Sequence, residues 1–192
     1  MDRAGRKLIS QYIFLNMKNT VFIATSIDGF IARKDGSIDW LLEQPNPSGS
    51  DYGFAEFMDR IDGIIMGRNT FETVSAFDEW AYTKPVFVLT KTLTELSGKW
   101  ASKGQIVKGE LSEVLQSLQD KNITRLYIDG GKTIQNFLKQ DLIDEMVITR
   151  IPIVLGSGIP LFTDDLPELK FEHTATEVYD NVLVKSSFLR KR

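Results

Sequence analysis

Two segments of the chain place glycine between a run of apolar residues and a helical pattern. Residues 126–134 read Leu-Tyr-Ile-Asp-Gly-Gly-Lys-Thr-Ile, and residues 64–72 read Ile-Ile-Met-Gly-Arg-Asn-Thr-Phe-Glu. Glycine lets a phosphate approach the backbone closely, and the unpaired amides of a first helical turn favour negative charge. Both segments are therefore predicted to be phosphate-binding turns. By itself, a Gly-Gly pair is equally compatible with a plain connection between a strand and a helix.

Cations and hydroxyl groups accompany these apolar runs. Arg68 stands at the second turn, and Thr90 and Lys91 follow a third apolar run. An arginine in such a turn can fork onto a phosphate. In an open α/β sheet, the crevice outside the carboxyl ends of the strands is the expected ligand site. Three strand ends at one edge therefore predict a site for a phosphorylated ligand, although each cation alone is equally compatible with a solvated surface position.

The composition argues against several kinds of site. The chain of 192 residues has a net charge of -3 and a pI near 5.3, so it offers no broad cationic surface to nucleic acid. It has no cysteine and one histidine, His173, which argues against disulfides, thiolate nucleophiles, metal sites and a Ser-His-Asp triad. No stretch approaches the ~20 apolar residues of a membrane span. We expect a cytoplasmic protein that binds neither nucleic acid nor membrane.

Short β-branched runs alternate with longer stretches of helical spacing, which is typical of an α/β sheet. Strands are expected at residues 21–24, 63–66, 85–89, 126–128 and 145–149, each apolar enough to be buried on both faces. Helices are expected at residues 52–61, 69–74, 111–118 and 134–138, and an antiparallel hairpin at residues 169–178 and 182–189. The predicted fold has three layers, with a mixed, mostly parallel central sheet, antiparallel C-terminal strands and about four flanking helices.

The pattern of strands and helices begins at Met17 and contains no linker or repeat. Residues 17–192 are therefore predicted to form a single domain. Residues 1–16 begin basic and turn apolar, but a small-residue cleavage site does not follow them. They are expected to be a leader or extension outside the fold.

The common dinucleotide and nucleotide motifs are absent. The first predicted strand is not followed by G-x-G-x-x-G, and the chain has no Walker sequence. Gly156-x-Gly158 is followed by Ile159-Pro160, a poor start for a helix. A dinucleotide would therefore be bound by a different scaffold.

The order of the motifs resembles the dihydrofolate reductase superfamily over residues 17–189. The resemblance is carried by residues 24–32 (Ala-Thr-Ser-Ile-Asp-Gly-Phe-Ile-Ala), Trp40, 66–72 (Met-Gly-Arg-Asn-Thr-Phe-Glu), 88–91 (Val-Leu-Thr-Lys) and 129–131 (Asp-Gly-Gly). Residues 142–145 and 150–162 are closer to one branch, the reductase domain of the bacterial bifunctional deaminase-reductase of riboflavin biosynthesis and its stand-alone relatives. The ordered set is specific, whereas no single motif is.

The resemblance implies that the cofactor is NADPH. Ala24 and Ile31 would border its nicotinamide. The residues implied to hold the adenosine side and the phosphates are Gly67, Arg68, Thr70, Thr90, Lys91, Gly130, Gly131, Lys132, Thr133 and Ile134. Arg68 and Lys91 favour NADPH over NADH, because a 2′-phosphate needs cations whereas a 2′-hydroxyl needs an acidic acceptor.

On the substrate side, the resemblance implies roles for Asp51, Thr149, Asp28 and Trp40. Asp51 would be the catalytic carboxylate, close to Thr149, that hydrogen-bonds an aminopyrimidine edge and favours its protonated form. Asp28 would belong to a mobile loop over the nicotinamide. The alternative for Asp51 is a plain helix N-cap following Ser50.

We expect an NADPH-dependent reductase acting on a pterin-like or aminopyrimidine heterocycle, similar to the 5-amino-6-(5-phosphoribosylamino)uracil reductase of riboflavin biosynthesis. Dihydrofolate reduction and NADPH binding without turnover are alternatives. Residues 41–50 are longer than in compact folate reductases, and the basic residues that would bind a ribose phosphate are not found. A homodimer through the C-terminal strands is a further expectation, because an uncovered sheet edge is a liability and the branch is often dimeric.

Overall fold

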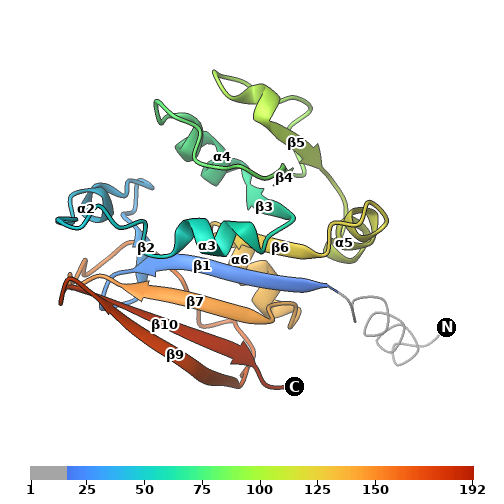
Figure 1. Ribbon diagram of the computed structural model, residues 1–192. Coiled ribbons are helices and arrows are strands. Elements are labelled where there is room, and N and C mark those ends of the chain that lie inside the picture. The colour runs from blue at the N-terminus through green and yellow to red at the C-terminus, as the bar shows by residue number, and fades with distance from the viewer. Residues whose placement is uncertain (1–16) are drawn as a thin grey trace.

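The computed structural model describes residues 17–192, which form an eight-stranded sheet with helices packed on it (Figure 1). The strand order is β5-β4-β3-β6-β1-β7-β10-β9. Its strands are β1 (Lys18–Thr25), β3 (Gly63–Gly67), β4 (Val86–Leu89), β5 (Gly104–Val107), β6 (Arg125–Asp129), β7 (Glu145–Arg150), β9 (Phe171–Tyr179) and β10 (Leu183–Arg190). The expectation for residues 1–16 lies outside the described residues.

Pairing in the sheet is parallel from β5 across to β7 and antiparallel at β10 and β9. This confirms the predicted mixed sheet with an antiparallel C-terminal edge. Strand β9 forms one outer edge, and its residues 172–178 are exposed. The expected homodimer through this edge stays a prediction.

The helices of the described part are α2 (Asp39–Leu42), α3 (Phe54–Asp59), α4 (Arg68–Ser75), α5 (Leu111–Gln119) and α6 (Gly131–Lys139), with a 3₁₀ turn at Ala101–Lys103. Each of the four predicted helices is present. Helix α3 begins at Phe54 rather than Tyr52, because Tyr52 and Gly53 have φ angles of 56° and 82°. These left-handed conformations cannot belong to a right-handed helix.

Three short strands were not predicted. Strands β2 (Phe30–Ala32) and β8 (Ile159–Pro160) form a separate two-stranded sheet, and β5 forms an edge of the large one. None exceeds four residues, so none shows the sustained alternation or apolar run on which a strand prediction depends.

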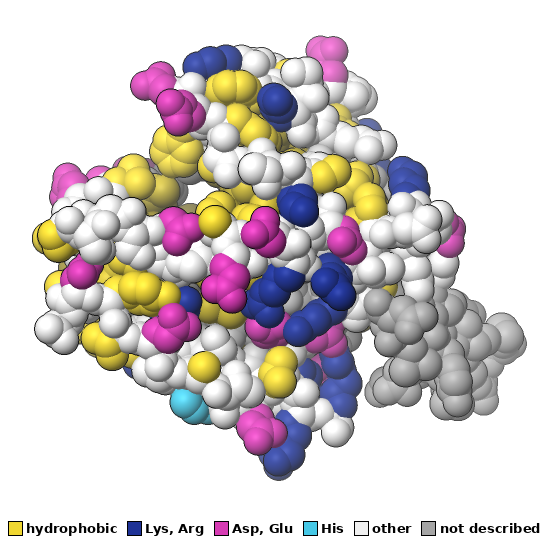
Figure 2. Space-filling view, in the orientation of Figure 1, with side chains coloured by type: hydrophobic (Ala, Val, Ile, Leu, Met, Phe, Trp, Pro, Cys, Tyr) yellow, Lys and Arg dark blue, Asp and Glu magenta, His cyan; other side chains and the backbone are white. Residues whose placement is uncertain are grey.

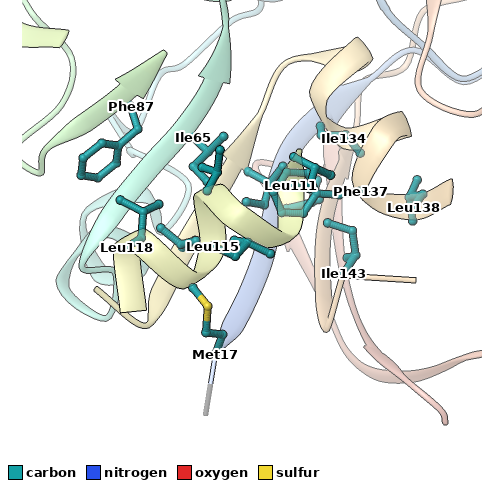
Figure 3. Packing of buried hydrophobic residues seen from close by; sticks show 14 of the residues in the cluster. Met17, Ile65, Phe87, Leu111, Leu115, Leu118, Ile134, Phe137, Leu138 and Ile143 are labelled. Carbon is teal, nitrogen blue, oxygen red and sulfur yellow. The ribbon is translucent and has the colours of Figure 1, made fainter. Parts of the chain in front are cut away.

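Alternate residues of a central strand enter two different hydrophobic clusters. Ile65 belongs to the cluster that contains Leu115 of α5 and Phe137 of α6 (Figure 3). Its neighbour Ile64 belongs to a second cluster, together with Phe57 of α3. Successive side chains of a strand point to opposite faces, so the sheet is covered on both faces. The strand ends are therefore where a ligand can reach the sheet.

Gly130 allows a test of how tightly the first glycine turn is packed. Its φ is 86°, and an added Cβ would overlap the Thr70 hydroxyl, whereas Gly36 has a φ of 89° with nothing within 4 Å. Gly36→Ala should cost about 1–2 kcal/mol of stability for the left-handed backbone alone. Gly130→Ala should cost roughly 1–3 kcal/mol more because of the overlap. Urea unfolding of both variants measures this difference, and equal losses would contradict the packing described.

Candidate functional site

A cavity of about 1340 Å³ opens where β1, β3, β4 and β6 end. Hydrophobic side chains gather around a hollow between the α4 and α2 regions in the space-filling view (Figure 2). Most of the predicted site residues line the cavity: Ala24, Ile31, Asp51, Gly67, Arg68, Thr70, Thr90, Lys91, Gly130, Gly131, Lys132, Thr133 and Thr149. The structure thus brings both glycine turns and both predicted catalytic residues to one site.

The two glycine turns pack against each other reciprocally. A Cβ on Gly67 would lie 3.2 Å from Thr133 Oγ1, and one on Gly130 would overlap Thr70 Oγ1. Each glycine therefore leaves the space that a threonine of the other helix fills. Because β3 and β6 are paired neighbours, helices α4 and α6 begin side by side.

Both helix starts remain available to a ligand. Within the described chain, neither α4 nor α6 has a side chain that caps its N-terminus, so their first-turn amides keep their hydrogen-bonding capacity. Arg68, Lys91 and Lys132 add exposed cations around them. Arg68 lies 3.6 Å from Glu72 in an exposed pair, and such pairs are weak. These groups fit the phosphates of a dinucleotide.

Ile134 does not belong to this cradle. Its N–H donates to the Gly130 carbonyl at 2.9 Å, and its side chain is fully buried in the main core. An amide that is already bonded within the helix cannot also bind a phosphate. The structure therefore corrects the prediction for Ile134.

Asp28 and Trp40 also lie outside the cavity wall. The Asp28 carboxylate accepts hydrogen bonds from Ser26 Oγ at 2.6 Å and from the N–H groups of Leu155 and Gly156 at 3.1 and 2.7 Å. These bonds, the one from Ser26 foremost, lower the pKa of Asp28. Asp28 thus joins its loop to the segment before β8, and the predicted mobile loop over the nicotinamide stays a prediction. Trp40 is 1% exposed in a small core cluster, because its ring packs inward from α2.

Pairing between β1 and β6 ends at the cavity. Their register stops at Thr20 opposite Tyr127, although β1 continues to Thr25. The Tyr127 hydroxyl donates to the Phe22 carbonyl at 2.9 Å, so a side chain replaces the missing strand partner. Phe22, Ala24 and Tyr127 all line the cavity. The cavity therefore reaches the point where the two central strands separate.

Asp51 bonds the start of α3 at the cavity wall. Its carboxylate accepts hydrogen bonds from the N–H groups of Ala55 at 2.8 Å and Gly53 at 2.9 Å. The bond from Ala55 is the largest cause of its lowered pKa. Thr149, on β7, is 6% exposed and lines the same cavity. Asp51 therefore bonds a first-turn amide of α3 from two residues before the N-cap, which is Gly53, while its catalytic role stays a prediction.

Comparison with known proteins identifies the family. Residues 18–185 match the family described as RibD C-terminal domain. The chain belongs to this family. The membership confirms the resemblance to the reductase domain of the riboflavin pathway and its stand-alone relatives.

Three relatives illustrate what this RibD C-terminal domain is similar to. The uncharacterized Bacillus subtilis protein YwjB is 35% identical over 171 residues, covering 86% of this chain and 94% of YwjB. A Shewanella sp. PV-4 protein of known structure, provisionally designated a riboflavin biosynthesis protein, is 52% identical with a TM-score of 0.87, covering 92% of this chain and 100% of that one. Enterococcus faecalis dihydrofolate reductase, complexed with NADP(H), is 16% identical with a TM-score of 0.64, covering 93% and 99%. The last likeness establishes a dihydrofolate reductase fold.

Tyr82 and Asp129 are cavity residues that the sequence did not single out. Tyr82 donates to Asp129 Oδ2 at 2.8 Å, and both line the cavity. Desolvation by the surrounding protein raises the pKa of Asp129, although the Tyr82 hydrogen bond opposes the shift. Desolvation also raises the pKa of Tyr82 and of Tyr127 well above the usual range. Asp129 precedes the Gly-Gly pair directly, so its position could have been noticed, whereas Tyr82 lies in a loop with no recognisable pattern.

Between residues 17 and 192, no helix is both long and apolar enough to cross a membrane. In the same part of the chain, no three or more His, Cys, Asp or Glu side chains are grouped as metal ligands.

Asp129 makes the stability of the fold depend on pH. Its pKa is raised in the folded protein, so between the unfolded value of about 3.9 and the folded value the native state binds more protons. Wild-type stability should therefore fall as the pH rises through that window, whereas an amide does not titrate. The unfolding free energy of Asp129→Asn should therefore increase relative to that of wild type between pH 4 and neutrality. Urea unfolding across this range, with the exposed Asp164→Asn as control, measures the trend, and a difference independent of pH would contradict it.

Proposed function

We propose that the protein is an NADPH-dependent reductase that delivers hydride to a pterin-like or aminopyrimidine heterocycle. The observation that carries the proposal is the pair of uncapped helix starts, packed side by side at one cavity with Arg68, Lys91 and Lys132 around them. Adjacent anion sites suit a dinucleotide, because its pyrophosphate and, in NADPH, its ribose phosphate need separate donors.

Different cavity residues would bind different parts of the dinucleotide. The turn at Gly130 would hold the bridging phosphates through the first amides of α6, and Arg68 would hold the adenosine side. Thr90 and Lys91, after β4, would meet the 2′-phosphate. Ala24, on β1 where pairing with β6 has ended, would border the nicotinamide.

The size of the cavity favours a second ligand beside the cofactor. Its volume of about 1340 Å³ exceeds the ~300–1,000 Å³ of a pocket for one drug-sized molecule. When bound, NADPH supplies the hydride. The contribution of the protein is to orient the heterocycle against the cofactor and to exclude water.

Two carboxyl groups are candidates for proton chemistry on the heterocycle. Asp51, with Thr149 in the same cavity, would hydrogen-bond an amino-pyrimidine edge and favour its protonated form. Burial raises the pKa of Asp129, so its carboxyl would take up a proton more readily than an exposed aspartate and would be the second candidate donor to a ring atom. Tyr82, bonded to Asp129 Oδ2, fixes the orientation of that carboxyl.

NADPH binding without turnover is the candidate of another class. The observation that favours it is the pair of hydrogen bonds that Asp51 accepts at the start of α3, which occupies both carboxylate oxygens. Within the enzyme proposal, reduction of 5-amino-6-(5-phosphoribosylamino)uracil and of dihydrofolate are the two reference reactions. A cytoplasmic location and a homodimer through β9 complete the proposal.

The cofactor preference can be measured by binding. Lys91→Ala should weaken NADPH binding about tenfold or more, because a hydrogen bond from a charged donor contributes about 1.5–3 kcal/mol. NADH binding should change little, since it lacks the 2′-phosphate. Lys121→Ala, at an exposed position outside the cavity, is the matched control. Calorimetry with both dinucleotides tests the assignment, which equal effects on NADPH and NADH would refute.

Substitutions can separate a catalytic role of the Asp51 carboxylate from its hydrogen bonds to the start of α3. An asparagine keeps only one of the two acceptor oxygens that bond the N–H groups of Gly53 and Ala55, so Asp51→Asn should lose about 1 kcal/mol of stability and remain folded. If the carboxylate acts in proton chemistry, its turnover should fall roughly 100-fold or more, as followed by NADPH absorbance. Asp51→Ala, which removes both acceptor oxygens and the charge together, should lose more stability. Full activity in Asp51→Asn would leave Asp51 with a structural role alone.

A further inference from the structure

The sheet order divides the cavity into two halves. Strands β4, β3 and β6 lie on one side of β1, and β7 and β10 lie on the other. The cations Arg68, Lys91 and Lys132 all follow strands of the first side. The second side, with α2, the loop before it and the segment up to the start of α3, contributes what is called here the apolar half. Its apolar lining is Phe22 of β1 with Ile38, Leu41, Leu42, Tyr52, Phe54 and Leu183, and its polar lining is Lys34, Asp35, Gln44, Asn46, Asp51 and Thr149.

Aromatic rings form much of the apolar half. Phe22 and Phe54 meet edge to face with ring centroids 5.7 Å apart. The Tyr52 ring meets Tyr179 in the same manner at 5.3 Å, so a neighbour outside the cavity holds it in place. Such a wall favours a flat aromatic ligand, because stacking and edge contacts add to the burial of its area.

The charged side chains that line the apolar half have a net negative charge. Of the described residues that line it, Lys34 alone is cationic, and the carboxylates of Asp35 and Asp51 line the cavity with it. Lys34 and Asp35 are adjacent in the chain and both exposed. A phosphate group placed here would face two carboxylates and one solvated ammonium.

The buried ammonium group of Lys185 lies behind the apolar half, but it is not available to a ligand. Lys185 on β10 is 8% exposed. Its Nζ donates to the Tyr52 carbonyl at 3.2 Å and to the Tyr179 hydroxyl at 2.7 Å, and it lies 3.1 Å from Glu177 Oε1. An ammonium has three donors, so these three partners saturate it. Lys185 holds the left-handed Tyr52 turn in place and offers no charge to the cavity.

We infer that the heterocycle reduced in this cavity is an uncharged aromatic ring system that carries no phosphate. The inference rests on the proposed function and narrows it. A phosphate monoester carries close to two negative charges at neutral pH, and placing it beside two carboxylates with one solvated ammonium to offset them is unfavourable. The phosphoribosyl compound of the riboflavin pathway is therefore a poorer fit than its dephosphorylated form or a neutral dihydropterin.

The test compares one heterocycle with and without its phosphate. The probes are 5-amino-6-(5-phosphoribosylamino)uracil, the same compound after phosphatase treatment, and a neutral dihydropterin. Binding to the NADP⁺-loaded protein is measured by calorimetry, and turnover by NADPH oxidation. We expect the dephosphorylated compound to bind at least ~10-fold more tightly than the phosphorylated one, with the same order in kcat/KM.

The binding and turnover measurements distinguish the inference about the substrate from the proposed reductase activity. Equal or tighter binding of the phosphorylated compound overturns the inference, and so does failure of all three probes to bind. If the uncharged probes bind but no probe is reduced, the inference about ligand chemistry stands and the proposed reductase activity fails.

A variant that adds a cation to the apolar half tests whether the substrate binds there. Leu42 lines the cavity and is 65% exposed, so a longer polar side chain fits there without repacking the core. Leu42→Lys should shift the preference at least ~5-fold toward the phosphorylated compound, because it supplies the missing cation. Leu42→Gln, polar but neutral, should leave the preference as in wild type. Identical preferences in both variants would mean that the substrate does not occupy the apolar half, which overturns the inference.

Discussion

The site depends on the close approach of two helix starts. Helices α4 and α6 can begin side by side only because Gly67 and Gly130 have no side chains where Thr133 and Thr70 lie. That arrangement directs two sets of first-turn amides into one cavity, where their dipoles act together. Any side chain at Gly130 would separate the helices, and the cations around them would then serve no common ligand.

The sheet supplies the second condition, which is an opening at its centre. Both faces are covered by hydrophobic clusters, so a ligand can reach the backbone only at strand ends. The end of β1–β6 pairing at Thr20 and Tyr127 extends that opening inward. The Tyr127 hydroxyl pairs with the Phe22 carbonyl, which prevents the separation of the strands from leaving an unsatisfied buried carbonyl.

The features that could be predicted from the sequence are those encoded by short segments. The β-branched runs, the amphipathic helices and the two glycine turns each have a local pattern, so the mixed sheet was predicted correctly and both glycine turns lie at one cavity, as expected. Ile134 was misassigned because a motif does not show which amides the helix itself uses. The positions of Trp40 and Asp28 outside the cavity wall could not be predicted, because their partners lie far away in sequence, as Gly156 does for Asp28. The saturated Lys185 could not be foreseen, since Tyr52 is 133 positions distant.

The two halves of the cavity differ in how freely they can change. The half with the two glycine turns is made of backbone amides and glycines that are fixed by packing against each other, so substitutions there disturb both helices. The apolar half is made largely by side chains of α2 and the irregular segment before α3, and such connecting segments tolerate substitution. A substitution at a single exposed position such as Leu42 can therefore alter which ligand charge is accepted without disturbing the glycine turns. On this physical ground, the fold constrains the half with the glycine turns strongly and the apolar half weakly, so the chemistry of residues 38–54 is a better guide to the ligand of the apolar half than the fold is.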